Sequence, residues 1–145
     1  MPTIIHTTLS STPVVPGGFQ SLPQAGAEVV FIGRTRCETH PSHGVLQHLD
    51  YEAHTPMAPL AIEELANEAA LRWPLLALRV QHAKGIVLVG EASVCIEVLA
   101  SHRGDAFEAC RWLIDTLKRR VPIWKQEVWQ NSTTWVDGTP VETAS

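Results

Sequence analysis

Apolar residues recur along the chain with two periodicities, one typical of strands and one of helices. Short runs rich in β-branched residues, and stretches in which apolar and polar residues alternate, predict strands. The predicted strands lie near Ile4 and over residues 27–32, 45–53, 75–82 and 92–99, and a short segment over 86–89 is expected to pair locally. The run over 27–32 is apolar enough to predict a buried strand, which Gly33 ends.

Helical spacing of apolar residues predicts two helices. In residues 57–73, Ile62, Leu65 and Ala69 fall on one face, and Pro74 ends the helix because proline cannot continue it. A second helix is expected after Ser101, which is a good N-cap residue. Its expected apolar stripe is Phe107, Cys110, Ile114, Leu117 and Val121, and Pro122 ends it.

The order of these elements predicts an α+β fold, with a mainly antiparallel sheet and helices packed on one of its faces. The length of 145 residues fits a single domain over 1–145. Within it we expect a Pro/Gly-rich N-terminal segment, 1–25, and a flexible tail, 136–145. Trp124, Trp129 and Trp135 follow the last helix, and some of these rings are expected to pack on the domain or on a partner chain.

The composition limits the cellular compartments in which the protein is expected. No apolar run approaches the ~20 residues that cross a bilayer, and no signal peptide pattern begins the chain. The three cysteines are an odd number and contain no CxxC pair, which disfavours a disulfide framework. We therefore expect a cytoplasmic protein without membrane attachment.

The net charge of −4 conceals clusters of positive charge. Seven of the 11 basic residues lie in three short stretches. The first stretch holds Arg34 and Arg36, the second holds Arg103, and the third holds Lys118, Arg119, Arg120 and Lys125. A local cationic site on a mildly acidic protein favours a small anionic ligand over nucleic acid, which calls for a broad basic face.

Lys118 and Lys125 are the first candidates for chemistry. Lys118 borders the apolar stripe of the last helix, and the turn that Pro122 forces can bring Lys125 into the same pocket. The alternative is that these cations only complement the dipole at the helix C-terminus. That second interpretation applies equally to Arg119 and Arg120, and the residues alone leave it open for the lysines.

Two further clusters offer anion-binding groups. His102 and Arg103 lie beside the exposed amides that begin the last helix, which favours an anion site or a simple capping turn about equally. Arg34 and Arg36 follow a strand, and guanidinium groups suit phosphate or carboxylate, although a solvated loop is the commoner meaning of such a pair. Cys37, with the histidines at 40 and 43, matches no common zinc spacing. We expect no metal and no cofactor.

Several segments together resemble one known family. They are Phe31–Arg36, Leu49–Ala53 with Pro56–Ala58, Gly90–Val94, Ser101–Arg103, Ala106–Ala109, and Leu117–Lys118 with Val121–Glu127. Over residues 25–137 the chain resembles the catalytic (large) subunit of molybdopterin synthase, the MoaE family. The Ser-His-Arg and Val-Pro-Ile-Trp-Lys segments at this separation are the most specific part of the likeness.

The resemblance implies an α/β hammerhead fold and a homodimer within a heterotetramer. It also implies a small ubiquitin-like sulfur-carrier subunit, whose C-terminal Gly-Gly thiocarboxylate enters the large subunit's pocket. Two sulfurs then pass to cyclic pyranopterin monophosphate and form the dithiolene of molybdopterin. A non-catalytic module that binds an anionic metabolite or a partner's tail is the alternative function.

The resemblance implies roles for the residues of this chain that match the family's motif positions. Lys118 and Lys125 match the family's two key lysines, which implies catalytic roles. Arg36, His102 and Arg103 match positions for the substrate anion, with Arg34 beside them. Gln126 and Glu127 match a binding segment in which Glu127 orients Lys125. The chain departs from the family at Cys37, where asparagine is common, in an unusual loop over 37–44, and at Ala83, where arginine is common after the histidine and for which Lys84 is the candidate replacement.

Overall fold

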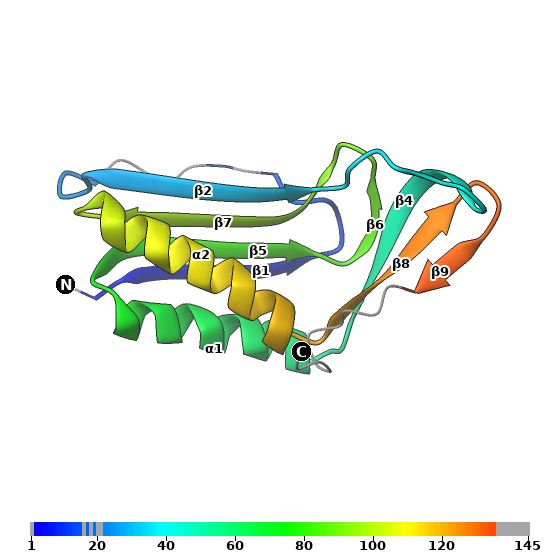
Figure 1. The fold of residues 1–145 in the computed structure, drawn as a ribbon. Coiled ribbons are helices and arrows are strands. Elements are labelled where there is room, and N and C mark those ends of the chain that lie inside the picture. The colour runs from blue at the N-terminus through cyan, green and yellow to red at the C-terminus, as the bar shows by residue number, and fades with distance from the viewer. Residues whose placement is uncertain (1, 16, 18, 20–21, 136–145) are drawn as a thin grey trace.

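The computed structural model describes residues 2–15, 17, 19 and 22–135, and it forms two sheets and two helices (Figure 1). The elements in chain order are β1 (Ile4–Ser10), β2 (Ala27–Arg34), β3 (Thr39–His40), β4 (Gly44–Ala53), α1 (Met57–Arg72), β5 (Leu75–Ala83), β6 (Gly85–Leu88), β7 (Ala92–Ala100), α2 (Arg103–Arg120), β8 (Ile123–Trp129) and β9 (Thr133–Trp135). The expected tail, 136–145, lies outside the described residues.

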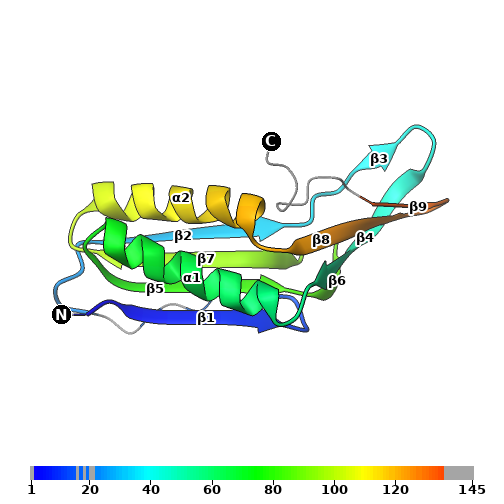
Figure 2. The ribbon, with the colours of Figure 1, turned by 90° about the horizontal axis from the view of Figure 1, so that it is seen from below.

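The first sheet has the strand order β1-β5-β7-β2. β1 joins β5 in parallel, and the other pairings are antiparallel. Both helices cover one face of this sheet, as the view from below shows (Figure 2). Ile62 and Leu65 of α1 and Leu113 of α2 are at most 1% exposed and pack in one core with strands β5 and β7. The α+β class predicted from the sequence is therefore confirmed.

The opposite face of the first sheet is also covered, so β7 is buried along its whole length. Val14, from the segment after β1, packs there with Ala83, Ala92 and Cys95. Its amide donates to the Ala92 carbonyl at 3.1 Å. Val14 thus covers part of this sheet face.

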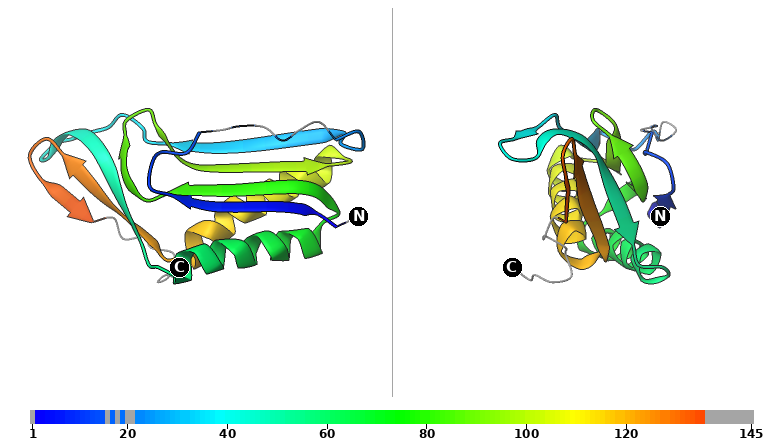
Figure 3. Two further views of the ribbon diagram at one scale, coloured as in Figure 1. Left: turned by 180° about the vertical axis from the view of Figure 1, so that it is seen from behind. Right: turned by 90° about the vertical axis from the view of Figure 1, so that its right-hand side faces the viewer.

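The second sheet has the order β3-β4-β8-β9, and β6 also pairs with β4. It extends from one end of the first sheet, where β4 and β8 lead away from the helices (Figures 1 and 3). Two expectations are corrected here. Residues 123–135, for which no strand was expected, form β8 and β9, and 86–89, expected to pair locally, contributes a strand that pairs with β4. Both errors concern partners far away in the chain, which local periodicity does not reveal.

The strand over 27–32 was expected to be buried, and this is wrong for part of its length. Val30 and Phe31 are 44% and 36% exposed. β2 is the last strand of its sheet and has a neighbour only on the β7 side. The strand also continues to Arg34 instead of ending at Gly33.

The second helix has a different start and a different buried face from those expected. Its N-cap is His102, which makes no side-chain capping bond, so Ser101 is not the cap. Phe107 is 60% exposed, whereas Leu113 is 1% exposed. Small residues at 106 and 109 let the helix approach the sheet along a stripe one position away from Phe107. Cys110, Leu117 and Val121 are buried as expected.

Candidate active site

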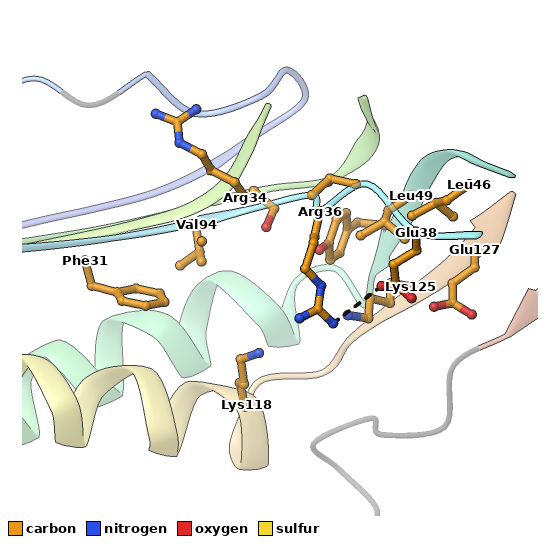
Figure 4. Close-up of a pocket in the computed structure, with 14 residues that line it drawn as sticks. Phe31, Arg34, Arg36, Glu38, Leu46, Leu49, Val94, Lys118, Lys125 and Glu127 are labelled. Carbon is orange, nitrogen blue, oxygen red and sulfur yellow. Dashed lines mark ion pairs between the residues drawn. The ribbon is translucent and has the colours of Figure 1, made fainter. Parts of the chain in front are cut away.

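A cavity of about 250 Å³ opens where the two sheets and the end of α2 meet (Figure 4). Its walls come from β2, β4, β7, β8 and the last turn of α2. The lining residues are Phe31, Gly33, Arg34, Thr35, Arg36, Glu38, Leu46, Leu49, Tyr51, Ser93, Val94, Lys118, Lys125 and Glu127.

The two lysines reach this cavity from adjacent elements. Lys118 lies in the last turn of α2, and the helix ends at Val121, whose amide donates to the Leu117 carbonyl at 3.1 Å. Pro122 then redirects the chain into β8. Lys125 lies two residues into that strand, opposite Tyr51 of β4. Both side chains point toward the cavity in Figure 4, so the turn does bring the two amines to one pocket.

Two irregularities in strand pairing shape the cavity. Between β2 and β7, Gly33 pairs with Val94 and Arg34 with Ala92, which leaves Ser93 as an extra residue. Neighbours in a regular strand point to opposite faces, yet Ser93 and Val94 both line the cavity. A Cβ on Gly33 would come within 2.6 Å of the Val94 side chain, so glycine is needed at this close approach.

The second irregularity lies between β4 and β8. Leu46 pairs with Trp129 and His48 with Val128, so Gln47 is the extra residue. The bulge places Leu46 and Leu49 on the same face, although they are three positions apart. It also explains why Val45 is 39% exposed while Leu46 is 4% exposed.

The environment lowers the pKa of Lys125 below its ordinary value. Burial is the main cause, because desolvation disfavours the charged amine, and the nearby positive charge of Lys118 acts in the same direction. Glu127 and Glu38 oppose this by stabilising the charged form. Lys125 therefore loses its proton more readily than a solvated lysine, whereas the Lys118 side chain is exposed.

Glu127 is held in place from β9. Thr134, its cross-strand partner, donates its hydroxyl to the Glu127 carboxylate at 3.1 Å. The indole of Trp129 donates to the same Thr134 oxygen, also at 3.1 Å. This chain of hydrogen bonds fixes the carboxylate that stabilises the charge on Lys125.

The two arginines of the β2 end are oriented differently. Arg36 points into the cavity mouth, where it forms an ion pair with Glu38 at 3.6 Å (Figure 4). Its side chain is 83% exposed, so it is available to a ligand. Arg34 points away from the cationic groups and donates to the Gly90 carbonyl at 2.9 Å (Figure 4). Of the pair, only Arg36 directs its guanidinium toward the lysines.

A buried histidine lies behind the cavity. His82 is 6% exposed, and its ring meets Tyr51 edge-on, with centroids 5.3 Å apart. Its Nδ1 lies 2.7 Å from the Ala83 carbonyl. The pKa of His82 is lowered to about 4, mainly by burial; the hydrogen bond with the Ala83 carbonyl opposes this, and the positive charges of Lys118 and Lys125 act in the same direction as burial. The ring is therefore neutral at physiological pH and adds no positive charge behind the lysines.

Three of the predicted site residues lie outside this cavity. His102 and Arg103 begin α2, about 22 Å from Lys118 by the helical rise of 1.5 Å per residue. Both are exposed. Gln126 lies between Lys125 and Glu127 on β8, so its side chain points to the other face of the strand.

The neighbouring arginines of α2 have structural partners. Arg120 forms an ion pair with Glu68 of α1 at 2.6 Å, and its guanidinium lies 5.9 Å from the Trp112 ring. Arg119 donates to the Thr116 hydroxyl at 3.4 Å. No group of three or more potential metal ligands converges anywhere in the part of the chain that the structure describes. His40 and His43 stack on each other instead, with centroids 4.2 Å apart.

The chain matches a known family. A sequence model of the family described as MoaE protein matches residues 9–120. The chain belongs to the MoaE family. It is 44% identical over 117 residues to the molybdopterin synthase catalytic subunit of Arabidopsis thaliana, which covers 81% of this chain and 58% of the plant protein. The chain thus spans little more than half the length of that MoaE relative.

Solved MoaE structures share the fold. Molybdopterin synthase from Staphylococcus aureus superposes with a TM-score of 0.81 at 30% identity, and the match covers 89% of this chain and 95% of that one. A chain in a complex of subunits 1 and 2 of molybdopterin-converting factor from Helicobacter pylori matches with a TM-score of 0.64 at 24% identity, over 79% and 73% of the two chains. That second likeness concerns the fold alone.

Several residues of this MoaE pocket were not predicted from the sequence. Tyr51 lies in the strand expected over 45–53, which was the available signal, but its proximity to Lys125 depends on the pairing of β4 with β8. Thr35 and Ser93 gave no signal in the sequence, because a bulge brings them to the cavity.

In the described residues, no helix is long and apolar enough to cross a membrane.

Proposed function

We propose that this MoaE chain is the catalytic subunit of a molybdopterin synthase. In this function it transfers two sulfurs from a thiocarboxylated carrier to cyclic pyranopterin monophosphate and so forms the dithiolene of molybdopterin. One observation carries the proposal: Lys118, Lys125 and Arg36 direct cationic groups into one cavity, at positions that match the family's motif.

The reactants are anionic, so the cavity suits them electrostatically. The pterin carries a phosphate, and the carrier's C-terminal thiocarboxylate is negatively charged. Arg36, exposed at the mouth, is suited to bind the phosphate through a planar pair of N–H donors. Lys118 and Lys125 are suited to hold the thiocarboxylate and to stabilise the negative charge that develops during sulfur transfer.

The lowered pKa of Lys125 gives this residue a second role. An amine that loses its proton readily can accept and return a proton during the reaction, whereas a solvated lysine stays charged at neutral pH. We assign Lys125 as the acid–base group and Lys118 as the charge-stabilising group. Glu127, held by Thr134, orients Lys125.

The proposed partner is the small ubiquitin-like sulfur-carrier subunit, whose Gly-Gly tail would enter the cavity. We also propose a homodimer within a heterotetramer. His102 and Arg103 are about 22 Å from Lys118 of their own chain by helical rise, so a role at the substrate anion requires that they serve the cavity of a second copy. Arg34, which lines the cavity, would act from its edge.

We further propose that the chain acts as a single domain over 1–145, because one cavity is built from both sheets. A cytoplasmic location is proposed as well. Its support is that Cys37, Cys95 and Cys110 are all free thiols, as is usual in a reducing compartment.

The direct test is to mix the protein with thiocarboxylated carrier and cyclic pyranopterin monophosphate and to assay dithiolene. Lys118→Ala is expected to reduce the rate by about a hundredfold or more, the typical effect of losing a charge-stabilising group. Because Lys118 is exposed, its removal should leave the fold and the affinity for the carrier's globular part unchanged. Arg119→Ala is the matched control, one residue away on the same helix and outside the cavity lining.

The same assay separates the alternative, a non-catalytic binding module. Such a module would bind the carrier tail or the pterin and form no dithiolene. Normal turnover by Lys118→Ala would contradict the assigned role of that lysine, and absence of product with the unaltered protein would contradict the proposed activity itself.

A further inference from the structure

Glu38 places a negative charge beside the cations of the cavity. The residue lines the cavity, and its carboxylate forms the ion pair with the Arg36 guanidinium at 3.6 Å (Figure 4). Its charge also stabilises the protonated form of Lys125, so it lies close enough to act on that amine. An anionic group of a ligand that binds between Arg36 and Lys125 therefore meets a carboxylate of the protein at the same place.

The backbone holds Glu38 at the mouth of the cavity. Its carbonyl accepts from the Leu46 amide at 2.9 Å, and the next residue, Thr39, begins β3, which pairs with β4. Glu38 belongs to the loop over 37–44, in which the chain departs from the family's usual pattern. Because these bonds attach the residue to the second sheet, its carboxylate stays within a side chain's length of Arg36 when a ligand binds.

The two carboxylates of the cavity are held to different degrees. Glu127 accepts a hydrogen bond from the Thr134 hydroxyl at 3.1 Å. Within the described residues, no hydrogen bond to the Glu38 carboxylate is found, and its 3.6 Å contact with Arg36 is longer than a hydrogen bond. The Arg36 and Glu38 side chains are 83% and 41% exposed, and ion pairs this exposed are weak. A ligand can therefore separate Arg36 from Glu38 easily, but the negative charge of Glu38 remains beside it.

The charge of Glu38 affects some anions more than others. The cationic groups directed into the cavity, Arg36, Lys118 and Lys125, face the carboxylates of Glu38 and Glu127. The repulsion between a ligand and a fixed charge is proportional to the ligand's own charge, so it is twice as large for a doubly charged anion. Because affinity depends exponentially on energy, a loss of about threefold for a singly charged anion becomes a loss of about tenfold for a doubly charged one.

We propose that Glu38 is a specificity-determining residue of the cavity, because its carboxylate repels small, doubly charged anions more strongly than the singly charged tail of the carrier. Small free anions bind by charge alone. The reactants of the proposed function are larger, and apolar side chains in the cavity wall, such as Phe31 and Val94, give them further contacts. Glu38 thus keeps small multivalent anions from occupying the cationic site. This inference rests on the proposed function, which supplies the reactants that the cavity must admit.

The test compares the unaltered protein with Glu38→Gln, which keeps the shape of the side chain and removes its charge. Sulfate and formate are the probes, because at pH 7 sulfate is doubly charged and formate is singly charged. Each is titrated at constant ionic strength into protein with labelled lysines, and the NMR signals of Lys118 and Lys125 report the Kd. We expect Glu38→Gln to lower the Kd of formate about threefold and that of sulfate about tenfold. In the dithiolene assay, sulfate should inhibit this variant at about one tenth of the concentration that inhibits the unaltered protein.

Glu52→Gln is the matched control, since it removes the same charge from an exposed side chain on the other face of β4. It should leave the ratio of the two Kd values unchanged. Glu38→Ala is the second variant, in case the glutamine makes a new contact, and it should show the same ratio as Glu38→Gln. Thermal unfolding of each variant verifies that it is folded.

Equal changes for the two anions, or unchanged Kd values in the folded variants, would overturn the inference, and so would the absence of anion binding in every variant. A rise in both Kd values would also overturn it, because Glu38 would then position Arg36 for the ligand instead of repelling the ligand. If the unaltered protein binds both anions but forms no dithiolene, the proposed function fails, while the comparison of the two Kd values still decides whether Glu38 selects by charge.

Discussion

Lys125 lies directly opposite Tyr51 in the antiparallel ladder of β4 and β8. Its backbone is therefore part of a sheet, and its amine is partly shielded from water by the cavity walls. Lys118 differs in both respects, because it comes from the last turn of a helix and its side chain is exposed. The two lysines of the site thus have unequal environments, and this inequality supports their different proposed roles.

The first prediction concerns the titration of Lys125. The chain has only three lysines, at 84, 118 and 125, so selectively labelled lysine signals can be followed individually by NMR. Lys125 should titrate below the ordinary lysine value of 10.5. Lys118→Ala should raise its pKa, because a repelling charge is lost, and Glu127→Gln should lower it further. An unchanged Lys125 pKa in both variants would contradict the electrostatic description of the site.

The second prediction tests the hydrogen bond from Thr134 to Glu127. Thr134→Val removes the donor that fixes the carboxylate, so the pKa of Lys125 should move in the same direction as in Glu127→Gln, by a smaller amount. The rate of dithiolene formation should fall severalfold, with the KM for the pterin little changed. Thr133→Val is the control, since the neighbouring side chain points to the other face of β9. Equal effects of the two variants would argue for general damage to β9.

The third prediction concerns acid stability. His82 has a pKa of about 4 in the folded protein and an ordinary value of 6.5, so the unfolded chain takes up the proton first as the pH falls. Its contribution to stability is complete above pH 6.5, falls between 6.5 and 4, and is constant below that. The loss amounts to about 3 kcal/mol at most. Burial is the main reason that the ring stays neutral, and the positive charges of Lys118 and Lys125 add to it.

Urea unfolding at pH 7 and at pH 4.5 measures this effect. The difference in the free energy of unfolding between the two pH values should shrink in His82→Gln, whatever the variant's stability at pH 7. His54→Gln, at an exposed histidine, should retain the full difference. If the two variants lose the same pH dependence, His82 is not its source.

The fourth prediction tests the buried face of α2. Leu113→Ala should lower the free energy of unfolding by about 2–5 kcal/mol, because it leaves a cavity under the helix. Phe107→Ala should change it by about 0.5 kcal/mol or less, because that ring is mostly exposed. Denaturant unfolding of both variants decides between this face and the stripe expected from the sequence, which included Phe107 and omitted Leu113.

Elements with strong local periodicity were predictable from the sequence. The α1 helix and strands β5 and β7 appear almost as expected, because their apolar residues repeat with a regular period. β8 and β9 were not predictable in this way. In β8, Lys125 and Glu127 line a cavity, and the strand pairs with β4, which lies about seventy or more positions upstream. β9 pairs in turn with β8.

The residues of the candidate site also fall into those that the sequence could predict and those that it could not. Lys118 and Lys125 could be placed together because a helix end and a proline lie between them in the sequence. Thr35, Ser93 and Tyr51 could not, because their convergence depends on strand register. The directions of Arg34 and Arg36 also depend on the bulge between β2 and β7. No residue type in the sequence predicts that bulge.

The two bulges make the number of residues in these strands as consequential as their identity. Deletion of Gln47 or of Ser93 would restore regular pairing and turn the residues beyond it to the opposite faces of their strands. Single-residue insertions and deletions should therefore be tolerated in the loop over residues 41–43 but not at these two points. An alignment of MoaE relatives that opens a gap at either bulge marks a chain whose pocket is built from different side chains.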